Sequence, residues 1–175
     1  NAPLLVCVGT LCERNGQDLA IAASAQVEGA RLILVGEGED ERHLRELSDD
    51  LGLSDRIHFA GSLDHDMLPL VLSAADAMVL LCAIEGFANV WIEAIGCGTP
   101  VVAIDTPAAR EVIENDTAGR LVKRDTDSIA AGLNALLNDP PLQRDVAALA
   151  TRFGWERHAA ERMALYDRVL AGNRR

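Results

Sequence analysis

The sequence predicts an α/β fold: a Rossmann-like parallel sheet of about six strands flanked by helices, with a helical C-terminal tail. First, short apolar runs alternate along the chain with amphipathic segments of helical period. Second, the runs are apolar throughout rather than alternating in polarity, which is typical of parallel strands buried on both faces. Third, the chain is 49% hydrophobic but only 3% aromatic, which indicates aliphatic packing between layers. Such alternation predicts right-handed strand–helix–strand units.

The expected strands are the six apolar runs, the first of which is "LLVCVG". They lie at residues 4–9, 30–38, 57–61, 77–81, 99–104 and 119–122. Five helical segments separate them, at residues 16–28, 39–53, 65–75, 90–96 and 108–115. In the second helical segment, Leu44, Leu47 and Leu51 are expected to share one buried stripe. Each strand is therefore expected to lead into a helix that covers the sheet.

After Val122 the pattern is helical only, at residues 125–138, 140–153 and 156–171. We therefore expect one domain over residues 1–175, in which residues 123–175 form a helical tail. The chain starts at Asn1 without a signal-peptide pattern, so we expect it to be a piece excised from a longer protein.

Composition excludes several classes of function. The net charge of -11 disfavours a nucleic-acid surface, which needs clustered cations. Lys123 is the only lysine among 16 basic residues, so an anion site has to use arginine, backbone N–H groups or helix ends. The four cysteines lack CxxC spacing, and neither His58 nor His65 has a metal-ligand partner at helical spacing, so we expect no metal and a reduced, cytoplasmic chain. No apolar run reaches the length of about 18 residues that a membrane span needs.

In an open parallel sheet, ligands bind beyond the carboxyl ends of the strands. Three loops there are rich in glycine or small residues: "VGTLCERNG", "VGEGED" and "IEGFAN". The chain contains no GK[ST] and no complete GxGxxG, which disfavours a P-loop enzyme and a nicotinamide enzyme. Gly36 and Gly38 in the second loop either close the turn or allow a ligand to approach, and both interpretations remain open.

The third loop carries most information. Gly86 permits a tight turn, and the N–H groups of residues 87–89 then form a helix start that suits a phosphate. Glu85 precedes that helix and Glu93 lies about one turn inside it. An ionised carboxylate accepts two hydrogen bonds, and a vicinal diol donates two. A ligand with a diol at each end and phosphate between them, such as a nucleotide sugar, matches this arrangement.

The segment "EGFANVWIEAIGCGTPVVAIDTPAAREVIENDTAGRLV" resembles the donor-binding, C-terminal domain of the retaining two-Rossmann-domain glycosyltransferases of family four, the group 1 glycosyl transferases. The resemblance extends over nearly the whole chain. It implies a metal-independent transferase that takes a nucleoside-diphosphate sugar and keeps the anomeric configuration. It also implies a missing N-terminal domain that holds the acceptor, with an acceptor at a membrane as one expectation.

The resemblance implies roles for individual residues. Glu85 resembles the catalytic glutamate that contacts the donor sugar, and Glu93 resembles the one that holds the ribose. The remaining donor-binding residues implied are Gly9, Thr10, Arg14, Gly36, His58, Phe59, Gly86, Phe87, Ala88 and Asn89. Of these, His58 and Phe59 match the strand beside the base.

The chain departs from the family in its cations. Thr10 and Asn15 stand where the family carries an arginine and a lysine, and Arg14 is the one cation in that loop. In the "DTPAARE" turn an alanine pair replaces a glycine pair, next to Arg110. Two alternatives to a transferase domain therefore stay open. One is a non-catalytic nucleotide-sugar-binding or assembly domain that lost the cation pair, and the other is a nucleotide-sugar epimerase.

Overall fold

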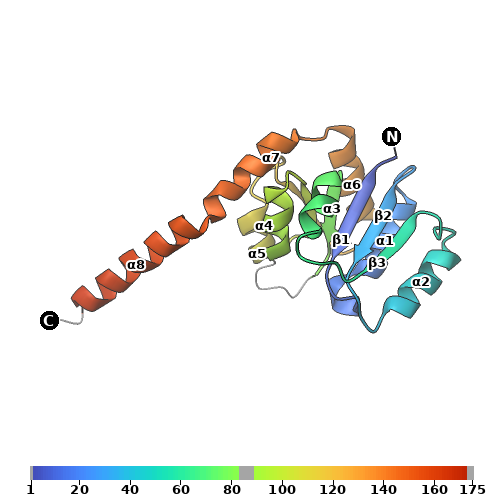
Figure 1. The fold of residues 1–175 in the computed structure, drawn as a ribbon. Coiled ribbons are helices and arrows are strands. Elements are labelled where there is room, and N and C mark those ends of the chain that lie inside the picture. The colour runs from blue at the N-terminus through green and yellow to red at the C-terminus, as the bar shows by residue number, and fades with distance from the viewer. Residues whose placement is uncertain (1, 83–88, 173–175) are drawn as a thin grey trace.

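A computed structural model describes residues 2–82 and 89–172 of the chain. Six strands form one sheet in the order β3-β2-β1-β4-β5-β6, and every neighbouring pair is parallel (Figure 1). The strands are β1 (Leu4–Val8), β2 (Arg31–Val35), β3 (Ile57–Gly61), β4 (Ala77–Leu80), β5 (Val101–Ile104) and β6 (Gly119–Val122). The predicted Rossmann-like sheet is therefore confirmed, with each strand within a few residues of its expected place.

Helices cover both faces of the sheet, because successive strand side chains point to opposite faces. One face packs against α1 (Gln17–Ala25), α2 (Glu41–Asp50) and α6 (Thr126–Asn138). The other packs against α3 (Leu68–Ala74), α4 (Asn89–Gly96), α5 (Pro107–Val112) and α7 (Gln143–Leu149). Every residue of β4 and β5 is buried, as the unbroken apolar runs predicted.

Each face has its own hydrophobic core. Leu44 and Leu133 belong to the first, and the fully buried Trp91 belongs to the second. Cys7 and Cys82 are buried, as expected for small core residues. The prediction for Leu51 is wrong, because α2 ends at Asp50 and the side chain of Leu51 is 42% exposed. Only the part of the leucine stripe inside the helix faces the sheet.

Local signals explain where two of these helices begin. The side chain of Thr106 accepts a hydrogen bond from the backbone N–H of Ala109 at 3.1 Å, which caps α5 ahead of Pro107. Asp125 caps α6 in the same way, because its carboxylate accepts from the backbone N–H of Ser128 at 2.8 Å. These caps satisfy N–H groups that a helix start leaves without a partner.

The helical region after β6 is not a single unit. α6 and α7 pack on opposite faces of the sheet, and a 3₁₀ helix, η2 (Ala150–Phe153), follows α7. α8 (Trp155–Gly172) extends away from the rest of the molecule (Figure 1). Its exposed side chains include Met163, Tyr166 and Leu170. Within the described residues, no helix combines the length and the apolar character needed to cross a membrane.

Candidate functional site

The strand order places a topological switch point between β1 and β4. These two strands are hydrogen-bonded neighbours, yet the chain continues from them toward opposite edges of the sheet. The loops that follow them therefore diverge and leave a crevice at their carboxyl ends. A cleft of about 390 Å³ lies at this point. It is lined by Val8, Gly9, Thr10, Arg14, Asn15, Leu68, Leu80, Asn89, Val90 and Glu93.

The cleft brings together site residues predicted from separate parts of the sequence. Gly9, Thr10 and Arg14 come from the loop after β1, whereas Asn89 and Glu93 come from α4. The predicted residues Glu85, Gly86, Phe87 and Ala88 lie outside the described residues. These predicted residues therefore form two walls of one cleft, for the part of the chain that the structure describes.

The wall formed by α4 is suited to an anion and to a hydroxyl-rich group. Asn89 and Val90, the first two residues of the helix, line the cleft, so the positive end of the helix dipole lies there. Glu93 is exposed on the next turn and presents a carboxylate to the same cleft. A carboxylate accepts hydrogen bonds from a diol, and a helix N-terminus attracts a phosphate.

The loop after β1 is held in place by the carbonyl oxygen of Thr10. This oxygen accepts hydrogen bonds from Asn15 Nδ2 at 2.8 Å and from Gln17 Nε2 at 2.9 Å. Between Thr10 and Gln17 runs a 3₁₀ helix, η1 (Glu13–Asn15), which was not predicted from the sequence. It ends at Gly16, whose φ is 70° and whose added Cβ would lie 2.9 Å from Leu81 Cβ. The loop is therefore fixed from inside the domain.

Gly36 and Gly38 allow the loop after β2 to contact the loop after β1. A Cβ at Gly36 would lie 2.1 Å from the carbonyl oxygen of Gly9, and one at Gly38 would lie 2.1 Å from that of Leu11. Backbone hydrogen bonds join the same loops, from Gly9 N–H to Val35 and from Leu11 N–H to Glu37. The turn-closing interpretation of these glycines therefore has a direct structural basis.

A second cavity of about 220 Å³ adjoins the cleft and shares Val8, Gly9 and Leu68 with it. Its other lining residues are Val35, Gly36, Ser62, Leu63 and His65. Its walls are mainly apolar. Ser62, Leu63 and His65 were not predicted as site residues from the sequence, although they follow the carboxyl end of β3, which is where ligands are expected.

His58 and Phe59 line neither cavity. β3 continues to Gly61, so both residues lie inside the strand rather than at its end. The Phe59 ring lies beneath the guanidinium of Arg45, 4.1 Å from it. The geometry therefore gives the predicted base contact at these two residues no support.

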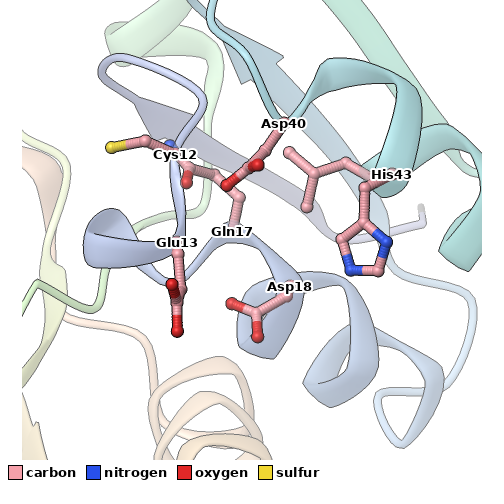
Figure 2. Close-up of a pocket in the computed structure, with 7 residues that line it drawn as sticks. Cys12, Glu13, Gln17, Asp18, Asp40 and His43 are labelled. Atoms are coloured by element: carbon pink, nitrogen blue, oxygen red, sulfur yellow. The ribbon is translucent and has the colours of Figure 1, made fainter.

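A third, small cavity of about 50 Å³ lies between the loop after β1 and the starts of α1 and α2 (Figure 2). Glu13, Asp18 and Asp40 contribute carboxylates to it, and His43 and Gln17 also line it. Gln17 Oε1 and Asp18 Oδ1 are buried there without a hydrogen-bond partner among the described residues. Clustered carboxylates repel phosphate, so this cavity does not suit the anion that the cleft favours.

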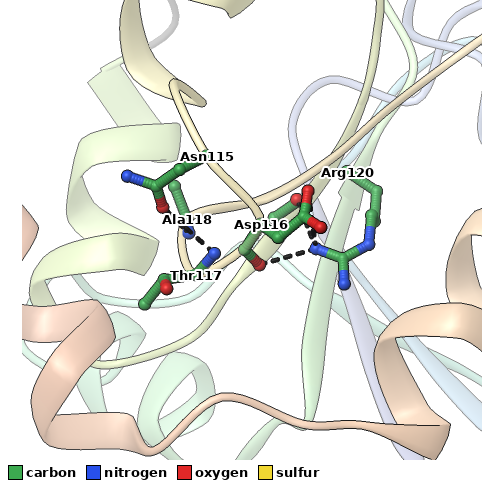
Figure 3. A network of polar contacts seen from close by, with 6 residues as sticks. Asn115, Asp116, Thr117, Ala118 and Arg120 are labelled. Carbon is green, nitrogen blue, oxygen red and sulfur yellow. Dashed lines mark hydrogen bonds and ion pairs between the residues drawn. The ribbon is translucent and has the colours of Figure 1, made fainter.

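Polar groups also gather in the turn between α5 and β6, at the opposite edge of the sheet (Figure 3). Asn115 Oδ1 accepts from the backbone N–H groups of Thr117 and Ala118, at 3.0 and 3.2 Å. Arg120 Nη1 donates to the carbonyl oxygens of Asp116 and Gly119, at 2.6 and 2.9 Å. These groups satisfy one another, which indicates a structural turn.

Arg110, which the sequence places beside the alanine pair, is engaged with Asp105 through two hydrogen bonds of 2.6 and 2.8 Å. This pairing holds the pKa of the Asp105 carboxyl below its usual value. The positive charge of Arg110 is thus already balanced by Asp105, which directly follows β5.

Comparison with known proteins identifies the kind of domain that carries this cleft. The family model described as "Glycosyl transferases group 1" matches residues 1–153. The chain belongs to this family.

Named glycosyltransferases align with most of this chain, which is a member of the glycosyl transferases group 1 family. A GDP-mannose-dependent alpha-(1-6)-phosphatidylinositol monomannoside mannosyltransferase of Mycobacterium tuberculosis is 33% identical over 149 residues, 78% of this chain. The lipopolysaccharide core biosynthesis glycosyltransferase LpsD of Rhizobium meliloti is 32% identical over 177 residues, 98% of this chain. The chain spans 39% of the first relative and 51% of the second, about half their length or less.

Solved structures of named proteins share the fold of this chain. Sucrose-phosphate synthase from Thermosynechococcus elongatus has a TM-score of 0.88 and 30% identity, covering 98% of this chain and 46% of that one. Anabaena HepE in complex with UDP-glucose has a TM-score of 0.80 and 28% identity, covering 87% of this chain and 44% of that one. The glycosyl transferases group 1 domain described here thus shares its fold with a protein solved in complex with UDP-glucose.

Proposed function

We propose that the chain is the donor-binding domain of a glycosyltransferase that moves a hexosyl group from a nucleoside-diphosphate sugar to an acceptor, with retention of anomeric configuration. The observation that carries the proposal is the cleft at the β1–β4 switch point, where the start of α4 and the Glu93 carboxylate face the loop after β1. This arrangement offers a dipole for phosphate and an acceptor for ribose hydroxyls.

The second cavity is the proposed binding site of the nucleobase. It adjoins the cleft through Val8, Gly9 and Leu68, and its other walls include Val35 and Leu63. A planar base buries apolar area there, while Glu93 accepts from the ribose and the diphosphate lies against the start of α4.

Glu85 is proposed to contact the hydroxyls of the donor sugar. In the transition state, positive charge develops on the sugar and negative charge on the departing diphosphate, and preorganised groups stabilise such charges electrostatically. We propose that the domain binds its donor without a metal ion. The acceptor is proposed to be a glycolipid or polysaccharide, consistent with the names of the relatives from Mycobacterium tuberculosis and Rhizobium meliloti.

The test is an amide NMR titration of the chain with UDP, GDP and ADP, each in the presence of a chelator. We expect one of them to shift signals of residues 8–16 and 89–93, and its identity would fix the class of donor. Glu93→Gln should weaken that binding, because an amide accepts fewer hydrogen bonds than a carboxylate. Glu46→Gln on α2, an exposed glutamate outside the cleft, is the matched control. Equal affinity of both variants would refute the role of Glu93.

The chain alone is expected not to glycosylate an acceptor, since it spans about half the length of its relatives. Product formed by the 175-residue chain in isolation would contradict this part of the proposal.

One observation favours the second candidate, a non-catalytic nucleotide-sugar-binding or assembly domain. Thr10 and Asn15 are uncharged, and Asn15 is buried with its amide directed at the Thr10 carbonyl. Glu85→Gln in the full-length protein separates the candidates. A transferase should lose product formation while it keeps nucleotide binding, whereas the other candidate has no product to lose.

A further inference from the structure

We propose that the small cavity between η1, α1 and α2 binds a guanidinium group, either of an arginine side chain in a polypeptide or of a free guanidinium compound. The cavity lies beside the loop after β1, and none of its lining residues lines the donor cleft. It is therefore a second ligand site, whose occupation does not require the proposed function to be correct.

Three carboxylates line the cavity, and none of them is paired. They belong to Glu13 of η1, Asp18 of α1 and Asp40, the residue before α2 (Figure 2). No ion pair or side-chain hydrogen bond links any of the three to another described residue. Within the described chain, no arginine or lysine lines the cavity either. The walls therefore carry negative charge without an arginine or lysine to balance it.

Asp40 stands where an aspartate normally caps a helix. It occupies the N-cap position of α2, yet its side chain makes no capping hydrogen bond. By contrast, Asp125 at the start of α6 accepts from the Ser128 N–H at 2.8 Å. The Asp40 carboxylate is therefore free of the structural role that its position predicts, and it lines the cavity instead.

Gln17 provides an independent indication of a ligand. Its side chain is 1% exposed and reaches into the cavity toward Cys12 and Asp40 (Figure 2). Its Nε2 donates to the Thr10 carbonyl oxygen at 2.9 Å, which fixes the amide, because a carbonyl accepts only from an N–H. Its Oε1 is buried without a hydrogen-bond partner among the described residues, as is Asp18 Oδ1. Because buried acceptors are almost always paired in native proteins, these two atoms indicate a donor from outside the described residues.

Size and geometry indicate what kind of donor fits. A water molecule needs roughly 10–15 Å³ of cavity volume, so about 50 Å³ accommodates a group of a few heavy atoms and excludes a sugar or a nucleobase. Among the described residues, no three histidine, cysteine or acidic side chains are arranged to hold a metal ion. The occupant is therefore a small organic group that carries positive charge and hydrogen-bond donors.

A guanidinium meets these requirements better than an ammonium. It has five N–H donors in one plane, whereas an ammonium has three donors on a single atom. The carboxylates of the cavity come from η1, α1 and the start of α2, so a planar fork can reach more than one of them. A guanidinium is also more weakly hydrated than an ammonium, so it leaves water more easily. The buried side chain of Leu44 adds an apolar wall.

The experiment is an NMR titration of the chain with methylguanidinium, methylammonium and methylurea. Methylurea has the shape of methylguanidinium without the charge, so it is the control for hydrogen bonding and packing alone. All concentrations stay far below those at which guanidinium unfolds proteins. We expect methylguanidinium to shift signals of residues 12–18 and 40–44, methylammonium to bind more weakly, and methylurea to leave the signals unchanged.

Two variants test the carboxylates. Asp18→Asn and Asp40→Asn keep the shape of each side chain and remove its charge. Each should weaken methylguanidinium binding about tenfold, because a hydrogen bond to a charged group is lost. Asp50→Asn, at the exposed end of α2 and outside the cavity, is the matched control and should bind like wild type. Unchanged signals of β1 and β2 verify that each variant is folded.

A second pair of ligands identifies the source of the guanidinium. Free L-arginine and a tripeptide with arginine between two glycines and both ends blocked present the same group with and without charged ends. Tighter binding of the peptide supports an arginine side chain of a polypeptide. Tighter binding of the free amino acid supports a small guanidinium compound.

The guanidinium site is refuted if methylguanidinium shifts no signals of the cavity, or if methylurea shifts them equally. It is refuted as well if Asp18→Asn and Asp40→Asn both bind methylguanidinium like Asp50→Asn. Displacement of methylguanidinium by an equal concentration of Mg²⁺ or Ca²⁺ would also overturn it, in favour of a metal site. Nucleotide binding in the cleft is measured separately, so the two proposals fail independently.

Discussion

Gly36→Ala is expected to damage the site through the backbone, because Gly36 lies where two loops of the cleft meet. Its φ is +132°, and an added Cβ would lie 2.1 Å from the carbonyl oxygen of Gly9 and 2.9 Å from the carbonyl carbon. Neither atom belongs to a side chain that could rotate away. Gly9 N–H is bonded to the Val35 carbonyl, and Gly36 N–H to the Gly61 carbonyl, so both strands resist the shift.

A comparison with Gly29→Ala indicates how much Gly36→Ala should lower the unfolding free energy. Gly29 also has a positive φ, +67°, but an added Cβ would meet nothing within 4 Å. Its substitution therefore measures backbone strain alone, about 1–2 kcal/mol, reduced by about 0.4–1 kcal/mol because alanine restricts the unfolded chain. Gly36→Ala adds a main-chain clash, and we expect a total loss of about 3 kcal/mol or more, as for other strained or overpacked positions.

Urea denaturation of wild type and both variants measures this difference, and NMR titration with nucleotide measures its effect on the cleft. We expect Gly36→Ala to lose binding together with stability, and Gly29→Ala to keep binding. If the two variants differ in unfolding free energy by less than about 1 kcal/mol, the close contact does not constrain the loops and the structural interpretation of Gly36 is refuted. Loss of binding at unchanged stability would instead favour direct approach of a ligand.

Three further predictions concern the body of the domain. Trp91→Ala should lower the unfolding free energy by about 3–5 kcal/mol. Trp91→Phe should lower it by less than half of that amount, because the buried indole Nε1 has no hydrogen-bond partner among the described residues that the substitution would remove. Urea denaturation of both variants measures the two losses. Burial raises the pKa of the Cys7 thiol to about 12, so Cys7 and the buried Cys82 should resist alkylation at pH 8 while the other two cysteines react, as mass spectrometry would show. The Ser128 backbone N–H holds the pKa of the Asp125 carboxyl below its usual 3.8. The ionised carboxylate therefore stabilises the folded state fully above pH 3.8, and this stabilisation is lost as the pH falls through the folded-state pKa. Asp125→Asn, which keeps the cap, should therefore have a melting temperature that approaches that of wild type at low pH.

The sheet could be predicted because its determinants are local. Buried parallel strands have to be apolar along their whole length, and the runs that become β4 and β5 are apolar for that reason. The position of the cleft also follows from the sequence, since a parallel sheet with a switch point offers one crevice at its carboxyl edge. Gly9, Thr10, Arg14, Asn89 and Glu93, which the sequence places in two separate loops and a helix start, line this one cleft.

The side of the cleft near β3 was harder to predict, although the strand itself was predicted at residues 57–61, where it lies. At its end Val35 pairs with Gly61 across an irregularity in the β2–β3 register. Leu63 and His65, which follow the strand, line the second cavity, whereas His58 and Phe59 lie inside the strand. The contact at residues 58 and 59 was implied by the resemblance, and no pattern within the segment after Gly61 indicates that its side chains face a cavity.

The orientation of the Asn15 side chain in the cleft was also not predictable from the sequence. The sequence shows that an amide stands where a cation is expected, but not which way the amide points. The structure directs it inward to the Thr10 carbonyl, where Gln17 also binds. A carbonyl that is satisfied twice by amides can anchor the loop without a lysine, so the loss of that cation does not require the loss of the loop.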